Sequence, residues 1–181
     1  MRRAPLVGLF AIAAMAVLAT PNAARALPSV GDALPDVKLV DAWGKTWEIR
    51  RDASKPVLVV YEDRTSATQN RELKEELAKL ARGDRYKQSV ALVAVADVAG
   101  YDYWPARGFV KDAIREESQK AGTNIYCDWD GAFRARLGLR RGVSTVVLYG
   151  ADGKVLFAHE GAVPPDRRAQ LLALLKAQIG G

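Results

Sequence analysis

The stretch VLVVY at residues 57–61 follows Pro56 and contains no polar residue before its final tyrosine. Such an unbroken apolar run is typical of a β-strand that is buried on both faces of a sheet. A second run of the same kind, VALVAVA at residues 90–96, ends at Asp97. Because a segment with helical periodicity separates the two runs, we expect an α/β domain with a central sheet.

That intervening segment predicts a helix over residues 66–82. Its apolar face consists of Leu73, Leu77, Leu80 and Ala81. These positions recur every three to four residues, as expected for one helical face packed on a core. Thr65 or Ser66 is suited to cap the start of this helix, and Gly83 is suited to end it.

Two longer helices and one short helix are expected toward the C-terminus. One begins at Pro105, ends at Gly122 and presents the apolar residues Phe109, Val110, Ala113 and Ile114. The other begins at Pro165 and carries the apolar stripe Leu171, Leu172, Leu175 and Ile179. Proline suits the first turn of a helix, where its missing N–H would have no partner. The short helix is expected over residues 132–137.

Alternating or apolar runs between turn residues predict the other strands. Residues 37–41 and 46–49 form an expected N-terminal β-hairpin. Residues 145–149 and 155–158 flank an Asp-Gly turn and form a second hairpin. A shorter strand is expected over residues 124–127. A tight hairpin joins antiparallel strands, so the central sheet should be mixed.

The first 26 residues have the organisation of a secretory signal peptide. Arg2 and Arg3 precede an uncharged stretch, which ends before the small-residue site Ala24-Arg25-Ala26. The uncharged stretch is shorter than the roughly 18 residues that a membrane-spanning helix needs. We expect cleavage after Ala26, which leaves one domain, residues 27–181, with no membrane span. The arginine pair leaves the export route, Sec or twin-arginine, open.

Charge and rare residue types exclude several classes of protein. The chain has 27 Lys+Arg against 21 Asp+Glu, a net charge of +6, and loss of the three arginines within residues 1–26 lowers it to +3. This mild basicity argues against nucleic-acid binding. One cysteine and one histidine exclude an intramolecular disulfide, a Cys-x-x-Cys pair and a Cys/His zinc site. No cofactor is implied.

The order of elements resembles a thioredoxin fold of the redoxin (peroxiredoxin-like) type, with a central mixed sheet flanked by helices and an N-terminal hairpin. The segments that carry this likeness are Val30–Asp36, Pro56–Tyr61, Asp130–Gly131, Gly138–Leu139, Val143–Thr145 and Asp152–Val155. A closer resemblance is to the periplasmic YtfJ family of Gram-negative bacteria. It is carried by Arg64–Ala67, Asp84–Tyr86, the Ser144 region and Asp152–Ala162. This second resemblance implies a periplasmic location.

The redox site that the resemblance implies lacks its key residues. Redoxins carry a thiol at the start of the first core helix, where the helix N-terminus stabilises the thiolate. Residues 62–69 of this chain contain no sulfur. The family also places a cis-proline opposite the thiol, where this chain has Ser144. A cis bond before a residue other than proline costs about 3 kcal/mol, so we expect a trans Val143–Ser144 bond.

A degenerate active site of this kind predicts a non-catalytic binding or accessory protein. The candidate groove residues are Arg64, Thr65, Ser66, Thr68, Val143, Ser144 and Thr145. The resemblance implies that an extended periplasmic protein or peptide binds there. The hydroxyls and N–H groups near Ser66 would also suit a carboxylate or phosphate, with Arg64 assisting. Plain helix capping explains the same residue types. The oligomeric state is left open.

The alternative is a thiol-dependent redox enzyme or peroxidase-like redoxin that acts through Cys127. Ile125 and Tyr126 precede this cysteine on a predicted strand, and two aspartates follow it. Adjacent carboxylates raise the pKa of a thiol and make the reactive thiolate scarcer. A buried structural cysteine is therefore the competing interpretation of Cys127.

Acidic residues directly follow three predicted strands. They are Glu62, Asp63, Asp97, Asp128 and Asp130. The carboxyl ends of parallel strands share one edge of a sheet, where ligands bind, and carboxylates suit Mg²⁺ or Ca²⁺. Aspartate after a strand is also an ordinary turn former, so we assign no metal site.

Three further groups of residues have both a functional and a structural interpretation. The aromatic residues Trp43, Trp47, Trp104, Trp129, Tyr101 and Tyr103 are suited either to a partner surface or to packing beneath loops. His159 has no nucleophile motif nearby and is expected to be a surface residue. The cluster Arg134, Arg136, Arg140 and Arg141 is interpreted as a solvated basic face.

Overall fold

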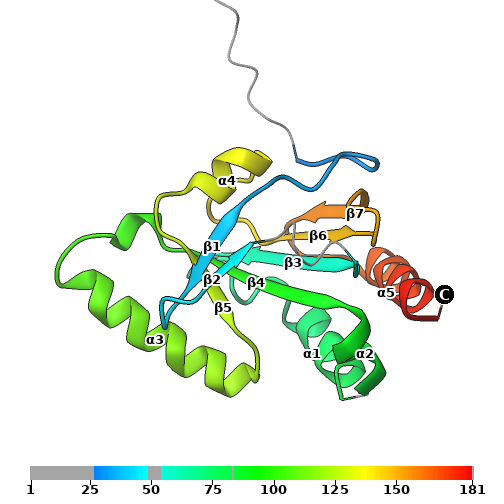
Figure 1. The fold of residues 1–181 in the computed structure, drawn as a ribbon, viewed down its shortest axis with the longest axis horizontal. Coiled ribbons are helices and arrows are strands. Elements are labelled where there is room, and N and C mark those ends of the chain that lie inside the picture. Colours follow the sequence, from blue (N-terminus) through cyan, green and yellow to red (C-terminus); the bar gives the residue numbers. More distant parts are fainter. Residues whose placement is uncertain (1–26, 49–53, 83, 181) are drawn as a thin grey trace, which may run out of the picture.

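The computed structural model describes residues 27–48, 54–82 and 84–180, and a seven-stranded sheet forms its centre (Figure 1). The strands are β1 Lys38–Asp41, β2 Thr46–Glu48, β3 Val57–Glu62, β4 Ala91–Asp97, β5 Ile125–Asp128, β6 Thr145–Tyr149 and β7 Val155–Glu160. Their order across the sheet is β2-β1-β5-β4-β3-β6-β7. All the strands predicted from the sequence are present, within a residue or two at their ends.

The sheet is mixed, as predicted. Strands β3, β4 and β5 run parallel, whereas the hairpins β1–β2 and β6–β7 add antiparallel strands on either side. The carboxyl ends of β3, β4 and β5 therefore lie at one edge of the sheet. Asp97 and Asp128 occupy opposite positions at this edge.

Helices cover both faces of the sheet. They are α1 Arg71–Leu80, α2 Asp84–Ser89, α3 Ala106–Ala121, α4 Ala132–Leu137 and α5 Pro165–Gly180, and a short 3-10 turn spans Ala99–Tyr101. Leucines of α1 and α5 pack with Leu58, Val146 and Leu148 of the sheet in one buried cluster. Helix α4 covers the opposite face, and Figure 1 shows it across the sheet from α1, α2 and α3.

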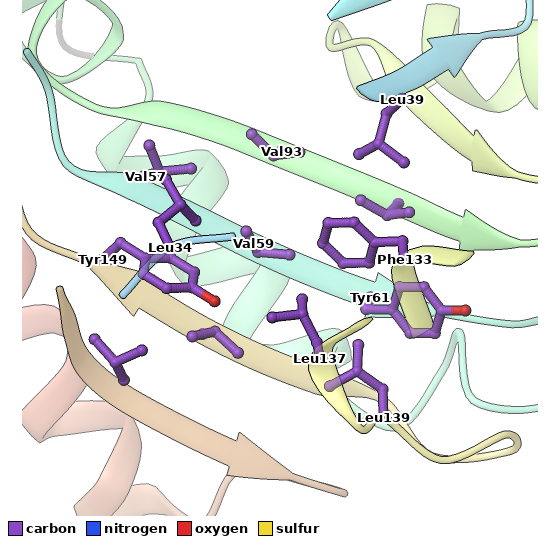
Figure 2. Close-up of a cluster of buried hydrophobic side chains, with 13 residues drawn as sticks. Leu34, Leu39, Val57, Val59, Tyr61, Val93, Phe133, Leu137, Leu139 and Tyr149 are labelled. Atoms are coloured by element: carbon purple, nitrogen blue, oxygen red, sulfur yellow. The ribbon is translucent and has the colours of Figure 1, made fainter. Parts of the chain in front are cut away.

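Strand β3 corresponds to the apolar run at residues 57–61, from which the fold was predicted. Val57, Val59 and Tyr61 point to the side of Phe133, as Figure 2 shows, while Leu58 belongs to the cluster on the other side. The rings of Tyr61 and Phe133 stack with centroids 5.7 Å apart. Each fully buried apolar side chain contributes about 1.5–3 kcal/mol, so β3 helps to stabilise the clusters on both faces of the sheet.

The first core helix begins later than predicted. Its first residue is Arg71, with Asn70 at the N-cap, and residues 64–70 form turns. The prediction that Thr65 or Ser66 caps this helix is wrong, because Asp63 binds the N–H groups of both residues and folds them into a turn. The predicted end at Gly83 lies outside the described residues.

Two other features differ from the prediction. Helix α2 was not expected, and its Tyr86 is buried against the α1–α5 cluster. In α3, Val110, Ile114 and Ser118 face inward, whereas Phe109 is 73% exposed. The residues of α3 that face β5 are therefore buried, and they include the polar Ser118. Phe109, which was expected on this face, points to solvent instead.

The predicted signal peptide, residues 1–26, lies outside the described part of the chain. Within residues 27–48, 54–82 and 84–180, no helix is both long enough and apolar enough to cross a membrane.

Candidate functional site

Asp63 organises the turn that follows β3. Its Oδ1 atom accepts hydrogen bonds from the N–H groups of Thr65 and Ser66, each at 2.9 Å, and from the Thr65 hydroxyl at 2.7 Å. Its Oδ2 atom accepts the N–H of Gly142 at 2.6 Å. Burial raises the pKa of Asp63, but these hydrogen bonds outweigh it and lower the pKa to about 2. The N–H groups of Thr65 and Ser66, which were considered as an anion site, are therefore bonded to the chain's own carboxylate.

Asn70 connects this turn to β6 and to the loop after β7. Its Nδ2 atom donates to Ser144 Oγ at 2.8 Å and to the Gly161 carbonyl at 2.9 Å, and its Oδ1 atom accepts the Val163 N–H at 2.8 Å. The Ser144 hydroxyl donates in turn to Glu62 at 2.9 Å. A buried polar network thus occupies the place where the resemblance implies a thiol and a cis-proline.

Gln69 connects the two halves of the site at the surface. Its Nε2 atom donates to the Gly142 carbonyl and its Oε1 atom accepts the Ser144 N–H, each at 3.0 Å. The cis peptide bond found in the described part of the chain precedes Pro105, so the Val143–Ser144 bond is trans, as expected.

The structure divides the predicted groove residues into exposed and buried ones. Arg64, Thr65 and Thr68 are exposed, and Val143 is half-buried. Ser66, Ser144 and Thr145 have no exposed surface. Among the buried hydroxyls, that of Ser66 accepts the Asp63 N–H and that of Ser144 bonds Asn70 and Glu62, whereas that of Thr145 has no hydrogen-bond partner within the described part of the chain.

An open groove of about 610 Å³ lies beside Gln69, between the start of α1 and the segment that leads into α5. It is lined by Thr68–Glu72, Ala162–Pro165 and Arg168. Of the seven predicted groove residues, Thr68 lines this groove and the other six do not.

The acidic residues at the ends of β4 and β5 form a second network. The Tyr61 hydroxyl donates to Asp128 at 3.0 Å, and two backbone N–H groups of α4 donate to the same carboxylate. The Arg134 guanidinium pairs with Asp97, and Arg141 Nε lies 3.6 Å from it. Burial raises the pKa of Asp128, against the effect of these hydrogen bonds. This network ties α4 to the sheet.

The carboxylates at this edge do not converge on a common point. Asp130 accepts the N–H of Ala132 at the start of α4, at 3.0 Å, and Glu62 pairs with Lys74 at 2.8 Å. Across the described residues, no three His, Cys, Asp or Glu side chains are placed together to hold a metal ion.

Cys127 lies in β5, opposite Val40 of β1, and packs with Ile114 of α3. It is 4% exposed. Burial, and secondarily the nearby Asp41, raises the pKa of its thiol to about 11. A thiol with these surroundings is mostly protonated at neutral pH and is shielded from reactants.

The aromatic residues divide between packing and exposure. Trp47 stacks on Tyr126 with ring centroids 5.3 Å apart, and Arg107 lies 4.6 Å from the centre of the Trp129 ring. Trp104 is 91% exposed, and Trp43, Tyr101 and Tyr103 are also exposed. This second set forms no part of the groove described above.

His159 and the arginine cluster have structural partners. The His159 ring lies 3.2 Å from the Ala162 carbonyl oxygen. Arg140 pairs with Glu160 at 2.6 Å and Arg134 pairs with Asp97, while Arg136 is exposed. The prediction of a solvated basic face therefore holds for Arg136 but not for Arg134, which is half-buried and pairs with Asp97.

Sequence reasoning missed Gln69 and Asn70, which bridge the two halves of the site. Both follow the turn of Asp63 and carry no motif of their own, since an amide side chain in a polar segment is common. Only the late start of α1 brings them opposite Ser144.

Comparison with known proteins places the chain in a wider context. Residues 43–178 match the sequence profile of a family described as "Bacterial protein of unknown function (YtfJ_HI0045)". No protein with a curated description matches the chain.

Solved structures show the same fold. A candidate thiol:disulfide interchange protein DsbE from Chlorobium tepidum has a TM-score of 0.62 at 22% identity, and the match covers 83% of this chain and 99% of that chain. Peroxidoxin BcpB from Mycobacterium tuberculosis has a TM-score of 0.58 at 22% identity, with 83% and 97% covered. The exposed lipoprotein thioredoxin Etrx1 from Streptococcus pneumoniae has a TM-score of 0.57 at 20% identity, with 79% and 99% covered. The predicted thioredoxin-like, redoxin-type fold is confirmed.

Proposed function

Since the chain belongs to the bacterial YtfJ family, whose function is unknown, we propose from its own residues that it is an exported binding or accessory protein without redox catalysis. Its partner is an extended segment of another polypeptide in the periplasm. The segment binds beside the turn of Asp63 and the loop before β6.

The observation that carries this proposal is the network of Glu62, Asn70 and Ser144 at the end of β3. Asn70 and Ser144 are almost fully buried, and each hydrogen bond in the network has a length of 2.8–2.9 Å. A redox site needs a thiolate and an approach for its substrate. Here a saturated polar core takes that place, which supports a scaffold rather than a reactive centre.

The surface above this network supports binding. Arg64, Thr65 and Thr68 are exposed on one side, and the exposed Arg141 lies beside Gly142 on the other. The two arginines and the Thr68 hydroxyl supply donors, whereas the Thr65 hydroxyl already donates to Asp63. Asp63 and Asn70 bind the neighbouring backbone at Gly142, Gly161 and Val163. A preorganised backbone lowers the entropic cost of binding an extended chain.

Capture of periplasmic proteins tests the proposal. Purified wild-type protein is compared with Arg64→Ala in the groove and with Arg136→Ala, which removes another exposed arginine from α4. We expect specific partners to be retained by wild type and Arg136→Ala and lost by Arg64→Ala. Equal retention of every specific partner by all three proteins would exclude this groove.

Export is tested separately. In a Gram-negative host the full chain should be recovered from the periplasmic fraction, and its N-terminal residue should be Leu27. Recovery of the uncleaved chain from the cytoplasm would contradict export.

The alternative, a redox enzyme acting through Cys127, makes a distinct prediction. Peroxide or disulfide reduction by wild type would have to disappear in Cys127→Ser. Because the thiol is buried and its pKa is about 11, we expect no turnover in either protein. Measurable turnover in wild type that Cys127→Ser abolishes would replace the present proposal.

A further inference from the structure

The Gln69 side chain makes the hydrogen bonds of a missing strand residue. Its amide N–H donates to the carbonyl of Gly142, and its amide oxygen accepts the N–H of Ser144. In a sheet, a residue paired with Val143 on a neighbouring parallel strand would donate to and accept from these same two backbone groups. One side-chain amide therefore takes the place of the backbone N–H and C=O of one residue on a strand beside Val143.

We propose that Gln69 is a displaceable cover for this backbone, and that an extended polypeptide binds by taking its place at Val143. This inference rests on the proposed function, because it assigns the binding to the same groove. It adds that the partner is recognised through its main chain, at the Gly142 carbonyl and the Ser144 N–H.

The surroundings of Gln69 allow its side chain to leave without disturbing the fold. Gln69 is exposed, and its backbone N–H remains bonded to the Ser66 carbonyl at 2.9 Å. Behind it, Asn70 holds the Ser144 hydroxyl and Asp63 holds the Gly142 N–H, independently of Gln69. Only rotation of one surface side chain separates the covered state from the open one.

The groove of about 610 Å³ beside Gln69 provides room for the rest of the partner. One of its walls, residues 162–165, is mostly apolar, and the other, Thr68–Glu72, is polar. Gly142, Val143 and Ser144 do not line this groove, so a chain that pairs at Val143 would reach it only by continuing past Gln69.

The cover should lower the apparent affinity for a partner. Each hydrogen bond that Gln69 makes must be exchanged before the partner can form its own, and only the open fraction binds. Removing the amide should therefore tighten binding by about fivefold to tenfold.

The experiment compares wild type, Gln69→Ala, Arg64→Ala at the predicted binding surface, and Arg136→Ala, a control on α4 outside that surface. The probe is the fluorescently labelled, oxidised B chain of insulin, an unfolded polypeptide without thiols, and binding is measured by anisotropy. Hydrogen exchange of the Ser144 amide is measured in parallel. We expect faster exchange and tighter binding in Gln69→Ala, with Arg136→Ala like wild type.

The outcomes separate this inference from the proposed function. If wild type and Gln69→Ala bind the probe equally and Arg64→Ala binds it more weakly, binding at the predicted surface is supported. The role of Gln69 as a cover is then contradicted. Weaker binding by Gln69→Ala also overturns the cover, because Gln69 would then be a contact. If neither wild type nor Gln69→Ala binds, the groove and its cover both fail. An unchanged exchange rate at Ser144 would exclude the hydrogen bond on which the cover depends.

Discussion

The N–H of Gly142 lies 2.6 Å from the carboxylate of Asp63, although 79 positions separate the two residues. This contact joins the turn after β3 to the loop before β6, the two segments in which redoxins are implied to carry their thiol and cis-proline. The same carboxylate binds Thr65 and Ser66. The backbone N–H groups of Thr65, Ser66 and Gly142 are therefore bonded to a carboxylate of the chain itself.

Replacing Asp63 by Asn should destabilise the protein at pH 7 by about 1–3 kcal/mol, since backbone N–H groups lose a charged acceptor. The folded pKa of about 2 lies below the ordinary value of 3.8. The ionised group therefore stabilises the fold above pH 3.8, and this contribution is lost as the pH falls toward 2. Urea unfolding of both proteins should show a stability difference that shrinks over this range. A difference independent of pH would contradict this role of Asp63.

Replacing Asn70 by Ala should cost about 3 kcal/mol. The change leaves the Val163 N–H and the Gly161 carbonyl without their partner in a buried place, and unpaired buried groups carry the full cost of lost solvation. Urea unfolding provides the measurement. Thr68→Ala, two residues earlier on the exposed turn, is the control and should stay within about 0.5 kcal/mol of wild type. Equal stabilities of the two variants would refute the network.

Replacing Tyr61 by Phe should raise the pKa of Asp128 further. Burial already raises it, and the Tyr61 hydroxyl is among the donors that oppose this effect. The variant keeps the ring that stacks on Phe133. Stability at pH 7 should fall by about 1–3 kcal/mol, and the loss should diminish as the pH falls through the pKa of Asp128 and the carboxyl becomes neutral. An NMR titration of the Asp128 carboxyl that matches wild type would contradict the contact.

Two phenylalanines test the observed packing of α3 and α4. Phe133 is fully buried, and its replacement by Ala should cost about 3–5 kcal/mol. Phe109→Ala removes the same side chain from an exposed position of α3, so its effect should stay within about 0.5 kcal/mol. Urea unfolding distinguishes the two. A large loss in Phe109→Ala would favour the inward orientation that the sequence predicted.

The order of strands and helices could be predicted because long apolar runs and periodic leucines are local signals. The run at residues 57–61 became β3, and Asp152-Gly153 marked the β6–β7 hairpin. Helix α2 escaped prediction because Tyr86 is the one large apolar residue in its six, so it shows no helical period. The start of α1 was predicted too early because Thr65 and Ser66 are good capping residues. The nearby sequence does not reveal that Asp63 bonds these two residues and the distant Gly142.

By itself the sequence determined that no redox pair exists and that buried strands alternate with helices, since composition and periodicity need no knowledge of distant contacts. The tertiary structure alone decided which hydroxyls are buried, that Cys127 is buried beneath α3, and that the Gln69 side chain bonds Gly142 and Ser144. The contacts of Gln69 and Asn70 join residues more than 70 positions apart within hydrogen-bond distance. Such contacts arise from the packing of the whole sheet, which no local stretch encodes.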